Sequence, residues 1–208
     1  MVLPILITAV VAYFLGNFNG AIIVSKLIAN EDVRTKGSGN AGLTNFTRNY
    51  GARASIFVIL IDVGKAVAAC LLGGLLLKGY GHYADGVALG GLFVILGHDF
   101  PVLLGFRGGK GILSGVTVAL MMDWRIGLFV FGVFLVAYGL TKYVSLGSIL
   151  GAVTYAVGFL VVYRQDLPVM LGGVFLGLLA IYMHRGNIRR LLRGEESKVY
   201  LFRKGGKK

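Results

Sequence analysis

Two glycine-rich segments of this sequence combine small polar residues with cations, a composition typical of phosphate-binding loops. The first is KGSGNAGLTNFTRNYG, residues 36–51. Its glycines leave backbone N–H groups free to converge on an anion, and such loops often lead into a helix N-terminus. Arg48 adds a guanidinium fork suited to phosphate. Close helix packing in a membrane would also use glycine and small polar residues. The candidate residues in this segment are Gly37, Ser38, Gly39, Asn40, Thr44, Asn45 and Arg48.

The second segment is GFRGGKG, residues 105–111, and it repeats the pattern. Gly111 stands where a Walker A loop would place the Ser or Thr that ligates magnesium, so an NTPase is not expected. A plain cationic turn is the simpler alternative. The candidate residues here are Gly108, Gly109, Lys110 and Gly111.

The histidines point to neither a metal centre nor a His-x4-Asp acyltransferase. His82, His98 and His184 are followed five positions later by Val87, Leu103 and Arg189, none of which is acidic. Histidines this far apart, with no carboxylate cluster, make a weak metal site. We expect no metal and no cofactor. His98 and His184 flank the anion loops, so each is a candidate for either a structural or a site role.

The composition is that of an integral membrane protein. Of the 208 residues, 56% are hydrophobic and only 14% are charged, against about a quarter charged in soluble domains. We expect one all-α polytopic domain, residues 1–208, with seven transmembrane helices. The first is expected to be retained, because no Lys or Arg precedes it as in a signal peptide. The predicted spans are about 3–25, 53–77, 86–105, 112–122, 126–143, 147–163 and 168–184.

The distribution of cations predicts the orientation. The tail 185–208 holds nine Lys and Arg, whereas the alternate loops on the other side hold only Lys78, Arg125 and Arg164. The positive-inside rule therefore places the N-terminus outside and the C-terminus in the cytosol. All the unusual polar segments then lie on the cytosolic side. Basic juxtamembrane residues there would contact anionic membrane lipids.

Polar residues inside two spans remain open to more than one interpretation. Asp62 and Lys65 lie one turn apart in the second span, where ionisable residues are functional candidates unless the pair simply neutralises itself. Asn17 and Asn19 in the first span would either bond between helices or line a site. The single cysteine, Cys70, excludes a disulfide framework within the chain.

Four segments together carry a resemblance to a known family. In chain order they are GSGNAGLTNFTRNYG, GHDFPVLLGFRGGKG, KYVSLGS and HRGNIRRLLRGEESK. In this order the chain resembles, over nearly its whole length, the PlsY family of bacterial acyl-phosphate-dependent glycerol-3-phosphate acyltransferases. Asn17 and Asn19 depart from the Ser and Pro that relatives often have, and the tail beyond Lys198 matches no pattern.

The resemblance implies a reaction and a set of site residues. A long-chain acyl phosphate would acylate the 1-hydroxyl of glycerol 3-phosphate, giving 1-acylglycerol 3-phosphate and inorganic phosphate. This is the first acylation of phospholipid synthesis, at the cytosolic face of the bacterial inner membrane. Ser38, Arg48, Lys110, His184 and Asn187 are the implied catalytic residues. The implied substrate-binding residues are Gly37, Gly39, Asn40, Thr44, Asn45, His98, Gly108, Gly109, Gly111, Ser145, Ser148 and Glu196.

Direct transfer without an acyl-enzyme is the expected mechanism, because an acyl phosphate already has a good leaving group and mainly needs alignment and charge stabilisation. Either His184 or a phosphate oxygen of the acceptor would take the proton, and the latter is favoured. We expect a monomer and no nucleic-acid partner. A phosphate transporter is the rival class, disfavoured because the polar motifs crowd onto one side and no inverted repeat is visible.

Overall fold

The computed structural model describes residues 1–199, and every regular element in this range is helical. The predicted tail extends beyond it, so residues 200–208 of that prediction lie outside the described part of the chain. The helices, in chain order, are α1 (Val2–Asn17), α2 (Gly20–Ala29), η1 (Val33–Thr35), α3 (Leu43–Tyr50), α4 (Ala52–Lys78), α5 (Tyr83–Asp99), η2 (Val102–Leu104), α6 (Ile112–Met122), α7 (Trp124–Thr141), α8 (Val144–Val162), α9 (Leu167–Met183) and α10 (Arg185–Leu192).

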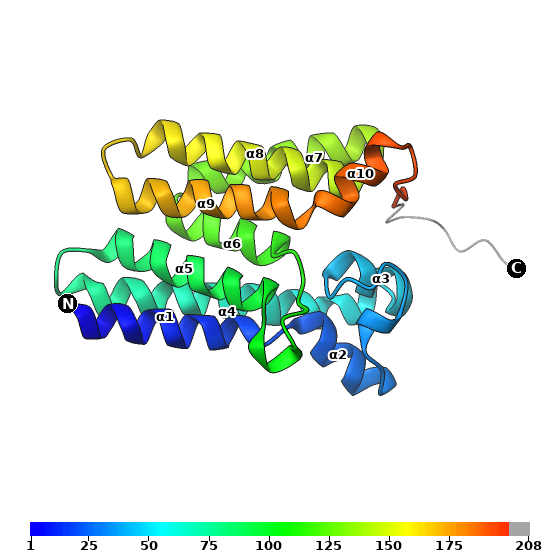
Figure 1. The fold of residues 1–208 in the computed structure, drawn as a ribbon, viewed down its shortest axis with the longest axis horizontal. Helices are drawn as coiled ribbons and strands as arrows, with labels where there is room; N and C mark the ends of the chain where they lie inside the picture. Colours follow the sequence, from blue (N-terminus) through cyan, green and yellow to red (C-terminus); the bar gives the residue numbers. More distant parts are fainter. Residues whose placement is uncertain (200–208) are drawn as a thin grey trace, which may run out of the picture.

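The long helices run roughly parallel or antiparallel to one axis (Figure 1). Helices α1, α4 and α5 pack together as one group, and α7, α8 and α9 as a second. Helix α6 lies between the groups and contacts members of both. The N-terminus lies at one end of the bundle, whereas α2, α3 and α10 gather at the other (Figure 1). We call this second end the polar end, because all four glycine-rich or polar segments meet there.

The predicted apolar runs correspond to helices, but fewer than seven of these helices are long enough to cross a membrane. Five segments of residues 1–199 are long and apolar enough to cross a membrane, or six if α9 and α10 count as one span bent by 54°. Helix α6, at 11 residues, is a shorter apolar helix. A helix of that length rises only about 17 Å, less than the roughly 30 Å hydrocarbon core. The seven-span topology stays a prediction.

The first predicted span, 3–25, is not one continuous helix. It breaks at Phe18, because Asn19 caps α2 by accepting a hydrogen bond from the Ile22 N–H at 3.1 Å. The ammonium of Lys65 then takes the carbonyl oxygens freed at the break, those of Phe18 at 2.9 Å and Gly16 at 3.3 Å. The break turns α2 away from the axis of α1 and starts the polar end of the bundle.

Helix α1 also anchors the turn that leads from α5 to the second glycine loop. The Tyr13 hydroxyl donates to the Phe100 carbonyl at 2.7 Å and accepts from the Val102 N–H at 3.2 Å. Asn17 Oδ1 accepts from the Leu103 N–H at 3.0 Å. Asn17 and Asn19 therefore hold chain segments together, and neither is part of the cavity wall formed by the described residues.

Candidate active site

A large cavity of about 1130 Å³ opens at the polar end of the bundle. Its wall takes residues from the first glycine loop and α3, the second glycine loop, the start of α8, the α9–α10 junction and the segment after α10. Every candidate site residue predicted from the sequence lines it: Gly37, Ser38, Gly39, Asn40, Thr44, Asn45, Arg48, His98, Gly108, Gly109, Lys110, Gly111, Ser145, Ser148, His184, Asn187 and Glu196.

The first glycine loop is built around the side chain of Asn45. Its amide donates to the carbonyls of Val33, Lys36 and Asn40 at 3.0 to 3.1 Å, and its oxygen accepts from the Ser38 N–H at 3.0 Å. Because these bonds occupy the amide, Asn45 shapes the loop. The hydroxyl of Ser38 and the guanidinium of Arg48 remain exposed at the cavity rim.

The second glycine loop lies directly against the end of α5. The N–H groups of Gly108 and Gly109 donate to the carbonyls of Asp99 at 3.3 Å and His98 at 3.1 Å. A Cβ on Gly108 would overlap the His98 carbonyl oxygen, and one on Gly109 would overlap its imidazole. Only glycine allows this close approach. Gly111, with φ of 63°, then starts α6.

Lys110 reaches from this loop to the last segment of the chain. Its ammonium donates to Asn187 Oδ1. The Asn187 amide donates to Glu196 at 2.8 Å, and Arg190 donates to the other Glu196 oxygen at 2.6 Å. Burial, together with the nearby charges of Arg190 and Arg185, lowers the pKa of Lys110 to about 8, although Glu196 opposes this. An anion bound beside Lys110 would therefore stabilise the charged form of its side chain.

The imidazole of His98 contacts the buried ion pair of Asp62 and Lys65 in α4. The Lys65 ammonium lies 2.8 Å from Asp62 Oδ1 and 2.7 Å from His98 Nδ1. Asp62 also accepts from the Gly20 N–H at 3.2 Å, at the start of α2. The pair thus neutralises itself, as one of the two sequence interpretations expects, and Lys65 also contacts a cavity residue; a functional role for the pair stays a prediction.

His184 stands at the junction of α9 and α10 and is 4% exposed. Its Nδ1 lies 2.8 Å from the carbonyl oxygen of Ala180. A carbonyl can only accept, so Nδ1 carries the proton and Nε2 is left as an acceptor in the neutral ring. This assigned tautomer is the one a proton acceptor needs.

Sequence reasoning missed two features of the cavity. Beyond the predicted Glu196, the backbone of the last segment forms part of the wall, where the Ser197 carbonyl accepts from Arg48 at 3.3 Å and the Val199 N–H donates to the Lys142 carbonyl at 2.9 Å. Asp99 is 1% exposed, and neither carboxylate oxygen has a hydrogen-bond partner within residues 1–199. No periodicity marks either feature. Among residues 1–199 no cluster of three His, Cys, Asp or Glu could hold a metal.

The comparisons with known proteins agree over nearly the whole chain. The family described as glycerol-3-phosphate acyltransferase matches residues 6–194. A protein of that name from Finegoldia magna is 40% identical over 197 residues, 95% of this chain and 97% of the relative. One from a Thermoanaerobacter species is 42% identical over 193 residues, 93% of this chain and 94% of the relative.

Two solved structures share the fold. They are crystal structures of PlsY, described as an integral membrane glycerol 3-phosphate acyltransferase, in a glycerol 3-phosphate form and a lysophosphatidic acid form. The first has a TM-score of 0.83 at 33% identity and covers 94% of this chain and 96% of its own. The second has a TM-score of 0.80 at 32% identity, with 95% and 96% covered. This chain is therefore an acyltransferase of the PlsY family of integral membrane glycerol-3-phosphate acyltransferases.

Proposed function

We propose that this enzyme transfers a fatty acyl group from a long-chain acyl phosphate to the 1-hydroxyl of glycerol 3-phosphate, releasing 1-acylglycerol 3-phosphate and inorganic phosphate. The observation that carries the proposal is that two glycine loops, each with a cation, face one cavity. Two substrates that both carry phosphate need two such loops.

The acyl chain of such a donor would need an apolar path beside the cavity, and a slot next to Lys110 supports this part of the proposal. A narrow apolar slot of about 40 Å³ runs from Lys110 between α5, α6, α7, α8 and α9. Its lining is mostly apolar or glycine, including Ile112, Val116, Phe134 and Tyr155. A donor with its phosphate in the cavity could direct the first carbons of its chain into this slot.

The chemistry requires alignment and charge stabilisation. The hydroxyl oxygen of glycerol 3-phosphate attacks the acyl carbonyl carbon, the bond from that carbon to the phosphate oxygen breaks, and phosphate leaves with the bonding electrons. Arg48 and Lys110 balance the negative charge on the phosphates, and Ser38 and Asn187 donate hydrogen bonds around the reacting carbonyl. No acyl-enzyme forms, because the donor already carries a good leaving group.

The proton of the attacking hydroxyl has two possible acceptors. The phosphate group of the acceptor is mostly dianionic at neutral pH, and we propose that one of its oxygens takes the proton. His184 is the alternative, since a proton on Nδ1 leaves Nε2 as an acceptor, and Nε2 makes no hydrogen bond within residues 1–199. Under our proposal, His184→Gln keeps turnover at saturating substrates within about tenfold of wild type. A loss in the 10²- to 10⁴-fold range typical of a missing general base, in a folded variant, would assign the role to His184.

The pKa of Lys110 predicts how activity depends on pH. Since burial lowers this pKa to about 8, the free enzyme loses the Lys110 charge as pH rises through 8. We expect kcat/KM for glycerol 3-phosphate to fall above pH 8. A bound phosphate raises the pKa, so kcat should hold to higher pH. In Lys110→Arg the fall should disappear, because a guanidinium stays charged. An unchanged alkaline limb in this variant would contradict the assignment.

The proposed setting is the bacterial inner membrane. We propose seven spans, an external N-terminus, the active site at the cytosolic face and activity as a monomer. Arg185, Arg189 and Arg190 of α10 lie at the polar end of the bundle, which suits the positive-inside rule and contact with anionic membrane lipids.

The deciding experiment reconstitutes the purified protein in liposomes with glycerol 3-phosphate and either palmitoyl phosphate or palmitoyl-CoA. We expect lysophosphatidic acid and phosphate in equal amounts from palmitoyl phosphate alone, formed more slowly by Arg48→Ala. Product from palmitoyl-CoA only would refute the proposed donor. An acyl ester trapped on Ser38 without acceptor would refute direct transfer. Binding without product, together with vesicle uptake of glycerol 3-phosphate, would favour transport.

A further inference from the structure

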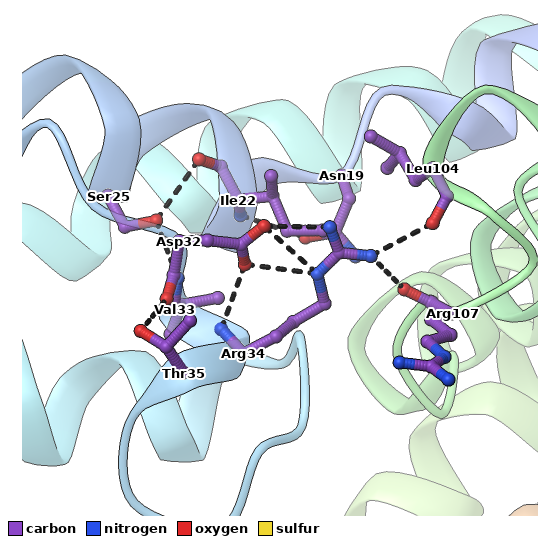
Figure 2. Close-up of polar contacts among 9 residues, drawn as sticks. All are labelled: Asn19, Ile22, Ser25, Asp32, Val33, Arg34, Thr35, Leu104 and Arg107. Atoms are coloured by element: carbon purple, nitrogen blue, oxygen red, sulfur yellow. Dashed lines mark hydrogen bonds and ion pairs between the residues drawn. The ribbon is translucent and has the colours of Figure 1, made fainter.

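Arg34 joins the two glycine loops of the cavity, although it is not part of the cavity wall among residues 1–199. It lies in η1, four positions before Ser38. Figure 2 shows its guanidinium between Asp32 on its own segment and the turn at the start of the second glycine loop. The two segments are about 70 positions apart in the sequence.

Asp32 fixes the plane of the guanidinium. Arg34 Nε donates to Asp32 Oδ1 at 3.0 Å and Nη2 donates to Oδ2 at 2.7 Å, while the Arg34 backbone N–H donates to Oδ1 at 2.9 Å. Each of the two side chains is 23% exposed. A bidentate pair of this kind leaves the guanidinium little freedom to rotate.

The remaining nitrogen of Arg34 holds both ends of a turn in the other segment. Nη1 donates to the carbonyl oxygens of Leu104 at 3.0 Å and Arg107 at 2.8 Å. Between these carbonyls, Gly105 and Phe106 have positive φ angles of 67° and 59°. Such a conformation is unfavourable for phenylalanine and persists only when its surroundings hold it. The turn ends three residues before Lys110.

We propose that Arg34 is a positioning residue that sets the distance between the loop bearing Ser38 and the loop bearing Lys110. This inference rests on the proposed function, in which the two loops hold the phosphates of the two substrates. The bonds of Asn45 in the first loop and those of Gly108 and Gly109 in the second do not involve Arg34, so we expect each loop still to bind its phosphate. What is lost is the alignment of the hydroxyl with the acyl carbonyl, and a misplacement of about 1 Å can cost about 10²-fold in rate.

The chain contains a matched control at the opposite end of the bundle. Asp123 and Arg125 form the same local arrangement, with the Arg125 N–H at 2.8 Å and Nε at 3.0 Å from Oδ1, and Nη2 at 2.7 Å from Oδ2. Within residues 1–199, Arg125 makes no bond that corresponds to the bridge from Arg34 Nη1 to Leu104 and Arg107. The Arg125→Ala variant therefore loses an ion pair similar to that of Arg34, while the two glycine loops stay connected.

The test compares Arg34→Ala, Arg34→Lys and Arg125→Ala in liposomes, with both substrates varied and folding checked by the thermal midpoint. We expect kcat to fall about 10- to 30-fold in both Arg34 variants, because one ammonium cannot replace the fork and the bridge together. KM for each substrate should stay within about threefold. Arg125→Ala should match wild type. Added guanidinium ion should restore part of kcat in Arg34→Ala and none in Arg34→Lys, where the ammonium fills the site.

Three results would overturn the inference: an unchanged kcat in folded Arg34→Ala, a change confined to KM for one substrate, or an equal loss in Arg125→Ala. Failure of the proposed donor looks different, since wild type would then be active only with palmitoyl-CoA. The same kcat comparison made with that donor would still decide the role of Arg34.

Discussion

Lys110→Met is expected to lower kcat/KM by about 10³-fold, the upper range for losing one preorganised donor at a developing charge. Methionine keeps most of the side-chain length but removes the ammonium that reaches Asn187. The Asn187, Glu196 and Arg190 bonds can remain. The loss is thus assigned to the missing positive charge beside the phosphates. Steady-state rates with palmitoyl phosphate and glycerol 3-phosphate measure it.

Lys78→Met is the control for this change. Lys78 is exposed at the C-terminal end of α4, at the end of the bundle opposite the cavity. The Lys78→Met variant also loses one positive charge, so it measures any general effect of net charge on membrane binding. The variant should keep wild-type rates. Less than a tenfold loss in folded Lys110→Met would remove Lys110 from the proposed mechanism.

Gly108→Ala is expected to lower kcat/KM for glycerol 3-phosphate by about 10²-fold, the effect of misplacing a binding group by about 1 Å. The new methyl group would overlap the His98 carbonyl oxygen and crowd the Asp99 carbonyl. Both are backbone atoms, which cannot rotate away as a side-chain tip can. The glycine loop must therefore move off α5, and Lys110 moves with it.

Gly132→Ala separates this effect from a general cost of replacing glycine. Gly132 lies in α7, is not among the described residues that line the cavity or the apolar slot, and a Cβ there would meet no atom within 4 Å. Alanine also favours the helix, so this variant should be as active and as stable as wild type. Similar kinetics for Gly108→Ala and Gly132→Ala would show that close contact between the loop and α5 is not needed.

The candidate residues could be found from the sequence because their chemistry is local. Glycine next to Ser, Asn, Lys and Arg indicates anion binding wherever the chain goes, and four such segments in one order identified the family. Apolar run lengths likewise predicted the helices to within a few residues, for example 53–77 against Ala52–Lys78. The length of an apolar run is fixed by the sequence and does not depend on tertiary contacts.

Some features could not be read from the sequence because they depend on contacts between distant segments. The first apolar run looks continuous, yet it breaks at Phe18, where Asn19 caps the next helix and Lys65 binds the freed Phe18 carbonyl. Asp62 and Lys65 could have neutralised each other without further effect, but the packing of α4 against α5 places Lys65 on His98. No periodic signal showed that Ser197 and Val199 join the cavity wall.

The sequence by itself determined the membrane class, the family and a set of candidate residues that share one cavity, because composition and motif order need no third dimension. Only the tertiary structure decided how those residues face one another. Arg34 shows the difference: nothing in its neighbours suggests that it bonds to carbonyls about 70 positions away. Backbone carbonyls carry no residue signature, so contacts made to them become visible only when the chain is folded.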